Sequence, residues 1–144
     1  MEAAAAVLGI QVHFADAQTD SDLNPAFERL VRLKVGALAL SSDQFHFSRR
    51  DQIISLAARH KIPAIYSTRQ FVMAGGLMSY GPNLADGYRQ IGIMTGRVLN
   101  GTSPADLPVQ RPTKFELVIN VKTAKALDLD VPPTLLARAD EVIE

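Results

Sequence analysis

The first half of the chain alternates between short apolar runs and segments with apolar residues at helical spacing. Short, mostly apolar runs over 10–15, 35–40 and 62–66 predict strands. The run 35–40 is continuous and apolar, as buried parallel strands are. Between them, apolar residues recur every three or four positions in 23–31 and 53–58, which predicts two amphipathic helices. This strand–helix–strand–helix–strand order predicts an α/β fold, a parallel sheet flanked by helices with right-handed crossovers.

Local signals predict where helices begin and end. The alanine-rich start predicts a helix that ends at Gly9, since Ala favours helices and Gly commonly ends them. Ser48 and Asp51 resemble a capping box at the start of the helix through 53–58. That helix is expected to end at His60–Lys61, where positive charge suits the helix dipole.

The second half predicts a similar mixture of short elements around one longer helix. Pro104, Pro108 and Pro112 mark the stretch from 102 to 113 as a surface connection. Asn120 is a good N-cap for the helix that follows it. The predicted elements are helix 69–74, strand 77–81, helix 82–99, strand 115–119, helix 121–127 and a last helix after Pro132–Pro133 that extends to Ile143.

Composition places the chain among soluble globular proteins. Its 144 residues suit one domain, and 47% hydrophobic with 21% charged residues is ordinary for such a domain. Fifteen basic residues balance fifteen acidic ones, so no nucleic-acid partner is indicated. The absence of Cys excludes a thiol nucleophile, a disulfide and a Cys-ligated metal.

Targeting signals are not evident in the sequence. No apolar run approaches the ~20 residues that span a bilayer. The segment 1–9 is short for a signal peptide and has Glu2 where positive charge is expected. We therefore expect the chain, expressed as it stands, to stay in the cytoplasm.

Candidate binding residues follow the predicted parallel strands, because ligands of open α/β sheets sit outside the carboxyl ends of the strands. Hydroxyls, a carboxylate, a ring and a cation occur there, and the carboxylate could hold an ammonium group. On spacing alone, the favoured interpretation is that Ser42, Asp43 and Ser67 cap the next helices. The residues concerned are Ser41, Ser42, Asp43 and Gln44 after one strand, and Tyr66, Ser67, Thr68 and Arg69 after the next.

The segment from Gly75 to Gly81 has two interpretations. Gly75 and Gly76 suit a tight turn or a close backbone approach. Tyr80 could stack on a ligand, although an aromatic residue on a short strand is more often part of the core.

Signatures of catalysis and cofactor binding are missing. Ser79 has Leu77 where a nucleophile elbow needs Gly, and neither a P-loop nor a G-x-G-x-x-G motif occurs. The histidines His13, His46 and His60 are scattered along the chain. His46 lies three residues after Asp43 and such a pair can transfer protons, but the spacing is more typical of solvated side chains. We expect no enzyme activity, no metal and no cofactor.

The final third resembles a known family. Its order is a linker, a strand, a short helix and a proline stop, carried by Leu107–Asn120, Lys122–Leu127 and Val131–Pro133. This order resembles the C-terminal end of substrate-binding proteins of ABC transporters, in the family with aromatic-amino-acid-binding members. Family members have two Rossmann-like lobes of the periplasmic-binding-protein fold around a cleft and are about twice this long. The resemblance implies that residues 1–144 are one α/β domain, mainly the second lobe of a truncated fold.

The resemblance also implies a function and a site. The family captures a small solute, such as an amino acid or small carboxylate, by hinge closure and delivers it to a membrane permease from the periplasm. Residues 77–100 would cross to the first lobe, with Gly75 and Gly76 near the hinge. The implied ligand-binding residues are Ser42, Asp43, Gln44, Tyr66, Ser67, Thr68 and Tyr80.

The resemblance also predicts oligomerisation, because it implies strand edges and a helix face that have no partner in this chain. Glu2–Gly9 matches the first helix of the second lobe, and the strand expected before it, central in a sheet of order 2-1-3-4-5, is absent. The strands 10–15 and 35–40 would keep open edges. The helix 82–99 would also expose an apolar stripe, so we expect a homodimer, or a higher even oligomer, with this helix at the interface. We also expect the chain to bind solute poorly, because half of the cleft walls are absent. The stripe consists of Leu84, Tyr88, Ile91 and Val98.

Two alternative functions stay open. One is the effector-binding part of a transcription regulator, which uses the same lobes but needs a DNA-binding helix-turn-helix before residue 1. The other is a small α/β enzyme, which needs a nucleophile and a base that converge.

Overall fold

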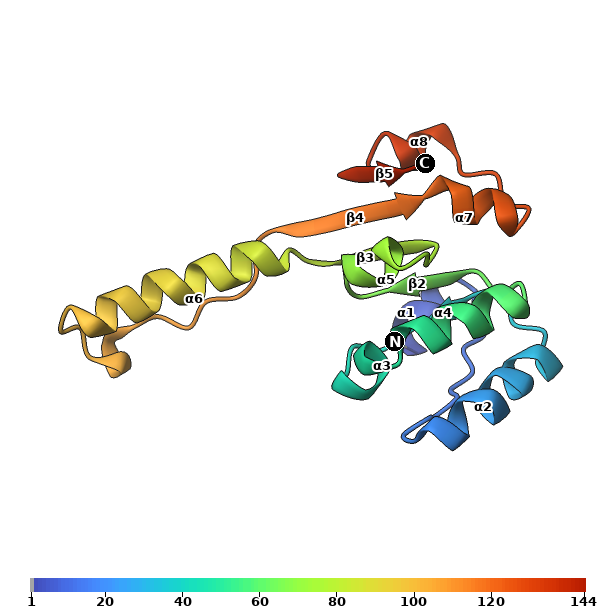
Figure 1. The fold of residues 1–144 in the computed structure, drawn as a ribbon, viewed down its shortest axis with the longest axis horizontal. Helices are drawn as coiled ribbons and strands as arrows, with labels where there is room; N and C mark the ends of the chain where they lie inside the picture. The colour runs from blue at the N-terminus through green and yellow to red at the C-terminus, as the bar shows by residue number, and fades with distance from the viewer. Residues whose placement is uncertain (1) are drawn as a thin grey trace.

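The computed structural model describes residues 2–144, which fold around one five-stranded sheet whose spatial order follows the chain. The first three strands are parallel, β4 runs antiparallel to β3, and β5 is parallel to β4. The predicted, mostly parallel α/β fold is confirmed. The antiparallel strand was not predicted, and it follows from the chain path, since β4 returns to the sheet from a long excursion after β3 (Figure 1). The strands are β1 (Leu38–Ala39), β2 (Ala64–Tyr66), β3 (Met78–Pro82), β4 (Phe115–Asn120) and β5 (Glu141–Ile143).

The helices pack on the sheet or on one another, except for the one in the excursion (Figure 1). The helix predicted to end at Gly9 is present, and Gly9 takes a positive φ of 65°. Asn120 caps the helix after β4 as predicted, its side chain accepting from the Thr123 N–H at 2.9 Å. The helices are α1 (Glu2–Val7), α2 (Asp20–Arg32), α3 (Gln44–Ser48), α4 (Arg50–Arg59), α5 (Arg69–Met73), α6 (Leu84–Leu99), the 3-10 turn η1 (Pro104–Asp106), α7 (Val121–Ala126) and α8 (Pro133–Leu136).

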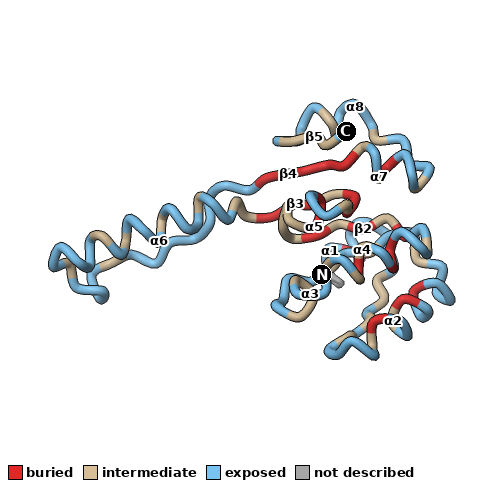
Figure 2. The backbone as a smooth tube through the Cα atoms, viewed as in Figure 1, coloured by how far each residue is buried: buried red, intermediate tan, exposed pale blue. Residues whose placement is uncertain are grey.

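The core lies between the sheet and the helices α2, α4 and α5. Ile53, Val72, Val118 and Ile119 have no exposed surface, and Figure 2 shows the buried segments gathered in this part of the molecule. Burying large aliphatic side chains of this kind stabilises a fold by about 1.5–3 kcal/mol each.

Two predicted strands are wrong in extent. Residues 10–15 form no strand, and the predicted strand 35–40 is reduced to the two residues of β1. The physical reason is that a strand requires a hydrogen-bonded neighbour, and within the described chain β1 has one only on the β2 side. Ile10 and Phe14 are consequently 58% and 52% exposed.

Two helix predictions are also corrected. The capping box at Ser48 does not form, because Asp43 caps α3 instead and the Ser48 hydroxyl donates to the Phe45 carbonyl at 2.8 Å. The last predicted helix stops at Leu136, and 141–143 form β5. Asp140 fixes the start of β5 beside β4, since its carboxylate accepts from the Leu117 N–H at 2.8 Å.

The arm, which we define as residues 84–113, extends away from the sheet (Figure 1). Its α6 begins at the N-cap Asn83, whose side chain accepts from the Asp86 N–H at 2.9 Å. The Asn83 N–H donates to the Lys114 carbonyl at 2.9 Å, so the outgoing and returning chains are joined at the root of the arm. None of the 16 residues of α6 is buried.

Candidate functional site

The ends of β1 and β2 open at the same edge of the sheet. The strands are parallel, with Ala39 opposite Ile65, and the Leu40 N–H donates to the Ile65 carbonyl at 3.0 Å. Ser41 and Ser67 therefore leave the sheet side by side. This brings the two candidate loops together, as expected for a ligand site at the carboxyl ends of parallel strands.

The first loop is organised by Asp43 and His46. One Asp43 oxygen accepts from the His46 N–H at 2.8 Å, which is the N-cap of α3, and the other lies 2.6 Å from His46 Nδ1. The same Nδ1 lies 3.2 Å from the Ser41 carbonyl oxygen. The helix-capping interpretation of Asp43 is thus correct. Because the carboxylate is held in place while 45% of the side chain stays exposed, it can still meet a cation; Ser42 and Gln44 beside it are exposed.

The second loop combines a buried ring with half-buried hydroxyls. Tyr66 is 2% exposed and stacks on Phe71 with ring centroids 4.6 Å apart, and burial raises the pKa of its phenol to about 12. Its ring therefore belongs to the core beneath the loop. Ser67 and Thr68 above it are half-buried, and the Thr68 hydroxyl is enclosed without a hydrogen-bond partner among the described residues. Such an unpaired group is able to bind a ligand or a water.

The end of β3 is pressed against the second loop. A Cβ on Gly81 would lie 1.8 Å from the Ser67 carbonyl oxygen, so only glycine allows this approach. Tyr80, beside it, is 58% exposed and stacks on Phe115 of β4 with centroids 5.9 Å apart. Sequence reasoning missed Phe115 because its proximity to Tyr80 arises from the antiparallel pairing of β3 with β4.

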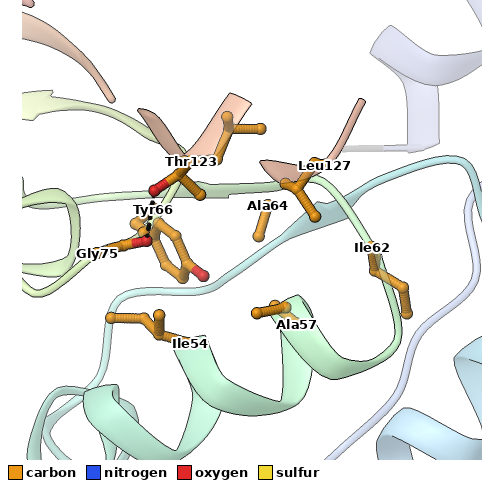
Figure 3. Close-up of a pocket in the computed structure, with 11 residues that line it drawn as sticks. Ile54, Ala57, Ile62, Ala64, Tyr66, Gly75, Thr123 and Leu127 are labelled. Atoms are coloured by element: carbon orange, nitrogen blue, oxygen red, sulfur yellow. Dashed lines mark hydrogen bonds between the residues drawn. The ribbon is translucent and has the colours of Figure 1, made fainter. Parts of the chain in front are cut away.

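Gly75 and Gly76 form the turn between α5 and β3, and Figure 3 shows Gly75 beside Thr123 and Tyr66. A Cβ on Gly76 would lie 2.6 Å from the Tyr66 ring, and the Gly75 carbonyl accepts from the Thr123 hydroxyl at 3.0 Å. The cavity beside them is about 20 Å³, too small for a solute. Both glycines precede β3, whereas the chain departs for the arm after β3, at Asn83. Gly76 is therefore required by packing, whereas Gly75 has open space around it and takes a positive φ of 102° that favours glycine.

Arg69 does not face solvent as a free cation. Its guanidinium contacts Glu141 at 2.5 Å and Glu116 at 3.4 Å, and the Asn83 amide donates to the same Glu116 oxygen at 2.9 Å. The Glu116 side chain is only 11% exposed. This cluster joins the second loop to β4, β5 and the root of the arm, contacts that depend on tertiary structure and have no local sequence signal.

Residues 2–144 contain neither a metal-binding cluster nor a membrane-spanning helix. No three His, Cys, Asp or Glu side chains in that range are placed to hold a metal ion. No helix in the same range is long and apolar enough to cross a membrane.

Comparison with known proteins gives a consistent assignment. A family model described as ABC transporter substrate binding protein matches residues 1–143. A tyrosine-binding protein from Clostridioides difficile (strain R20291) is 33% identical over 115 residues, which are 77% of this chain and 32% of that protein.

Two solved structures match nearly the whole chain. An ABC domain from Streptococcus pneumonia, in complex with L-Trp, is 28% identical with a TM-score of 0.86, covering 98% of this chain and 49% of that one. A ligand-free, open substrate-binding protein with adhesive properties from Clostridium difficile is 25% identical with a TM-score of 0.69, covering 99% and 47%. The chain thus spans about half the length of these solved relatives and about a third of the tyrosine-binding relative.

Proposed function

The chain belongs to the family of ABC transporter substrate-binding proteins, and we propose that it forms one lobe of a two-lobed solute receptor, the second lobe of the family fold. The observation that carries this is the match to the L-Trp complex, which includes 98% of this chain but 49% of the solved one. A cleft between lobes needs both walls, and this chain supplies one. The solute is a small molecule, an amino acid or a small carboxylate, captured by closure and passed to a membrane permease.

The strand ends supply the polar contacts of this site. The Asp43 carboxylate, held by His46, pairs with the ammonium group of an amino acid. Ser42, Gln44 and Ser67 provide further hydrogen-bonding groups at the same edge of the sheet. The Thr68 hydroxyl is enclosed, so the second loop must shift for this group to pair with the solute.

The apolar part of the site is the stacked pair Tyr80 and Phe115. Both rings are half-exposed or more, at 58% and 50%, beside the polar loops. Exposed aromatic faces suit an aromatic side chain, in keeping with the L-Trp and tyrosine relatives. Tyr66 supports the second loop from the core.

Closure is proposed to turn about the root of the arm. Residues 77–100 lead to the other lobe, and the chain crosses at Asn83 and returns at Lys114, where one backbone hydrogen bond joins the two crossings. Gly75 and Gly76 brace β3 from its far end. The complete receptor works in the periplasm or outside the cell.

When residues 1–144 are alone, a second copy is proposed to cover the arm and produce a homodimer. Ile91→Asp places a charge on the apolar stripe of α6, where Ile91 is 59% exposed. Ile93→Asp is the matched control on the other side of the same helix. Sedimentation equilibrium should show an even oligomer that Ile91→Asp weakens more than Ile93→Asp does. A monomer at all concentrations would refute the dimer.

Calorimetry with L-Trp and L-Tyr tests the function. Residues 1–144 alone should bind more weakly than micromolar (about −8 kcal/mol), because half of the cleft is absent. A longer chain containing both lobes should bind tightly and lose about tenfold or more with Asp43→Asn, but not with Asp51→Asn. Tight binding by residues 1–144 would contradict the proposal that they form one wall of the cleft. If Asp43→Asn left the affinity of the longer chain unchanged, the assignment of Asp43 to the binding site would be wrong.

A further inference from the structure

The ring of His46 is placed to orient the Asp43 carboxylate. Its Nδ1 lies 2.6 Å from one Asp43 oxygen and 3.2 Å from the Ser41 carbonyl oxygen. A carboxylate and a carbonyl only accept hydrogen bonds, so Nδ1 must carry the proton that both of them face. The other ring nitrogen, Nε2, makes no hydrogen bond within residues 2–144. The neutral ring is therefore held in its Nδ1–H form, and Nε2 is the atom that can take up a further proton.

The Asp43 carboxylate keeps the capacity to accept further hydrogen bonds. A carboxylate has about four lone-pair sites on its two oxygens. One oxygen accepts from the His46 N–H at 2.8 Å, and the other faces the His46 ring, so each oxygen has a site left. The side chain of Asp43 is 45% exposed, whereas that of His46 is 13% exposed. The ring is thus enclosed, while the carboxylate that it orients stays open to a ligand.

We propose that His46 is a positioning residue whose charge sets how strongly Asp43 holds an ammonium group. This inference rests on the proposed function, in which Asp43 pairs with the ammonium group of an amino acid. With a neutral ring, the pair carries the single negative charge of the carboxylate. A proton on Nε2 makes the ring positive and cancels that charge, which weakens the attraction for ammonium. Solute capture is therefore strongest when His46 is neutral, and acidification favours release.

The other charged groups near the ring are paired or exposed. At the start of α4, Arg50 lies 3.6 Å from Asp51, and the preceding Arg49 lies 2.5 Å from Asp20. The titratable residues that line the cavity beside β1 together with His46 are His13, Asp16 and Lys34. The aspartate and the lysine of this set are exposed and opposite in charge. Histidine is the side chain that ordinarily titrates between about pH 5 and 8, so His13 provides the matched control.

The proton form of the ring is tested first, without any solute. Nitrogen NMR of residues 1–144 with labelled histidines shows which ring nitrogen carries a proton and follows the uptake of the second one as pH falls. At pH values where the ring is neutral, His46 should have its proton on Nδ1 and a bare Nε2. A neutral ring with its proton on Nε2 would overturn the positioning role, whether or not a solute binds.

The charge effect is tested by titrating the same chain with millimolar L-Trp, which keeps both of its charges between about pH 5 and 7. The affinity, measured by NMR, should fall about three- to tenfold as His46 takes up its proton. His46→Asn puts an amide N–H in place of Nδ1 but cannot be protonated, so it should keep the higher affinity at every pH. His46→Leu lacks a donor and should bind weakly throughout. His13→Asn should retain the pH dependence of the parent.

Four binding outcomes would overturn the proposal. A pH dependence that persists in His46→Asn, or disappears in His13→Asn, would belong to another group. Equal affinities of His46→Asn and His46→Leu would remove the positioning role. The same pH dependence for indole-3-propionate, which lacks the ammonium group of L-Trp, would separate the effect from Asp43. If L-Trp disturbed no residue at the strand ends, the proposed function would fail together with the charge effect, while the Nδ1–H form of the ring would stand.

Discussion

The helices α4 and α6 differ in what their apolar faces meet. Both have apolar residues at helical spacing, and both were predicted from that spacing. In α4, Ile53 and Leu56 are 0% and 4% exposed against the sheet and α2. In α6, which is longer, Tyr88 and Ile91 are 72% and 59% exposed. An amphipathic pattern therefore predicts a helix and the face it will bury, but not whether the partner of that face is in the same chain.

This difference divides the chain into a body that holds the core and an arm whose apolar face is exposed. Isolated helices of about 15 residues are marginal in water, and α6 has 16 residues with none buried. The body, in contrast, holds the core and the polar loops of the site. The arm supplies the connection to whatever closes over them.

The largest expected difference is in how truncating an apolar side chain of each helix changes the free energy of unfolding. Ile53→Ala removes a fully buried side chain and should lower the free energy of unfolding by about 2–5 kcal/mol. Ile91→Ala removes an exposed one and should change it by less than about 0.5 kcal/mol in the monomer. Denaturant unfolding of both variants measures this. Equal losses would mean that α6 belongs to the body.

Two glycines make a second comparison of body and arm. Gly81→Ala forces a Cβ against the Ser67 carbonyl and should cost about 1–3 kcal/mol of unfolding free energy. Gly87→Ala in α6 meets nothing within 4 Å and should stabilise the helix by about 0.5–1 kcal/mol. Thermal unfolding followed by circular dichroism reports both changes. A harmless Gly81→Ala would contradict the close packing of β3 on the second loop.

The third comparison differs only at alkaline pH. Burial raises the pKa of Tyr66 from 10.0 to about 12, so the folded state retains a proton that the unfolded state loses. Its contribution to stability is complete below pH 10 and declines as pH rises toward 12. Tyr66→Phe should flatten the fall in stability over this range, while Tyr88→Phe on the exposed face of α6 should not. Unfolding free energy measured across the range decides between them, and identical profiles would place Tyr66 outside the core.

Elements defined by local signals were predictable from the sequence. The apolar pattern of α6 lies within the helix, and its cap is the adjacent Asn83. The cap of α7 is likewise the adjacent Asn120. Elements defined by distant partners were not. The strand β5 was mistaken for a helix because its pairing with β4 is not visible locally, and residues 10–15 have the composition of a strand but no neighbour to pair with.

The candidate site also has features that the sequence predicts and features that only the structure reveals. The loops after β1 and β2 were predictable, because parallel strands bring their carboxyl ends to one edge. The Asp43 cap of α3 and the partnership of Tyr80 with Phe115 required the structure. The ion pairs that occupy Arg69 also required it, since Glu116 and Glu141 are far from it in sequence.

Hydrogen exchange along the monomer tests the division into body and arm most directly. At concentrations where sedimentation shows a single chain, the amides of α4 and β4 should exchange only through global unfolding. Those of α6 should exchange orders of magnitude faster, close to the rate of an unfolded peptide, because no part of the body covers them. Protection of α6 equal to that of α4 in the monomer would contradict the account.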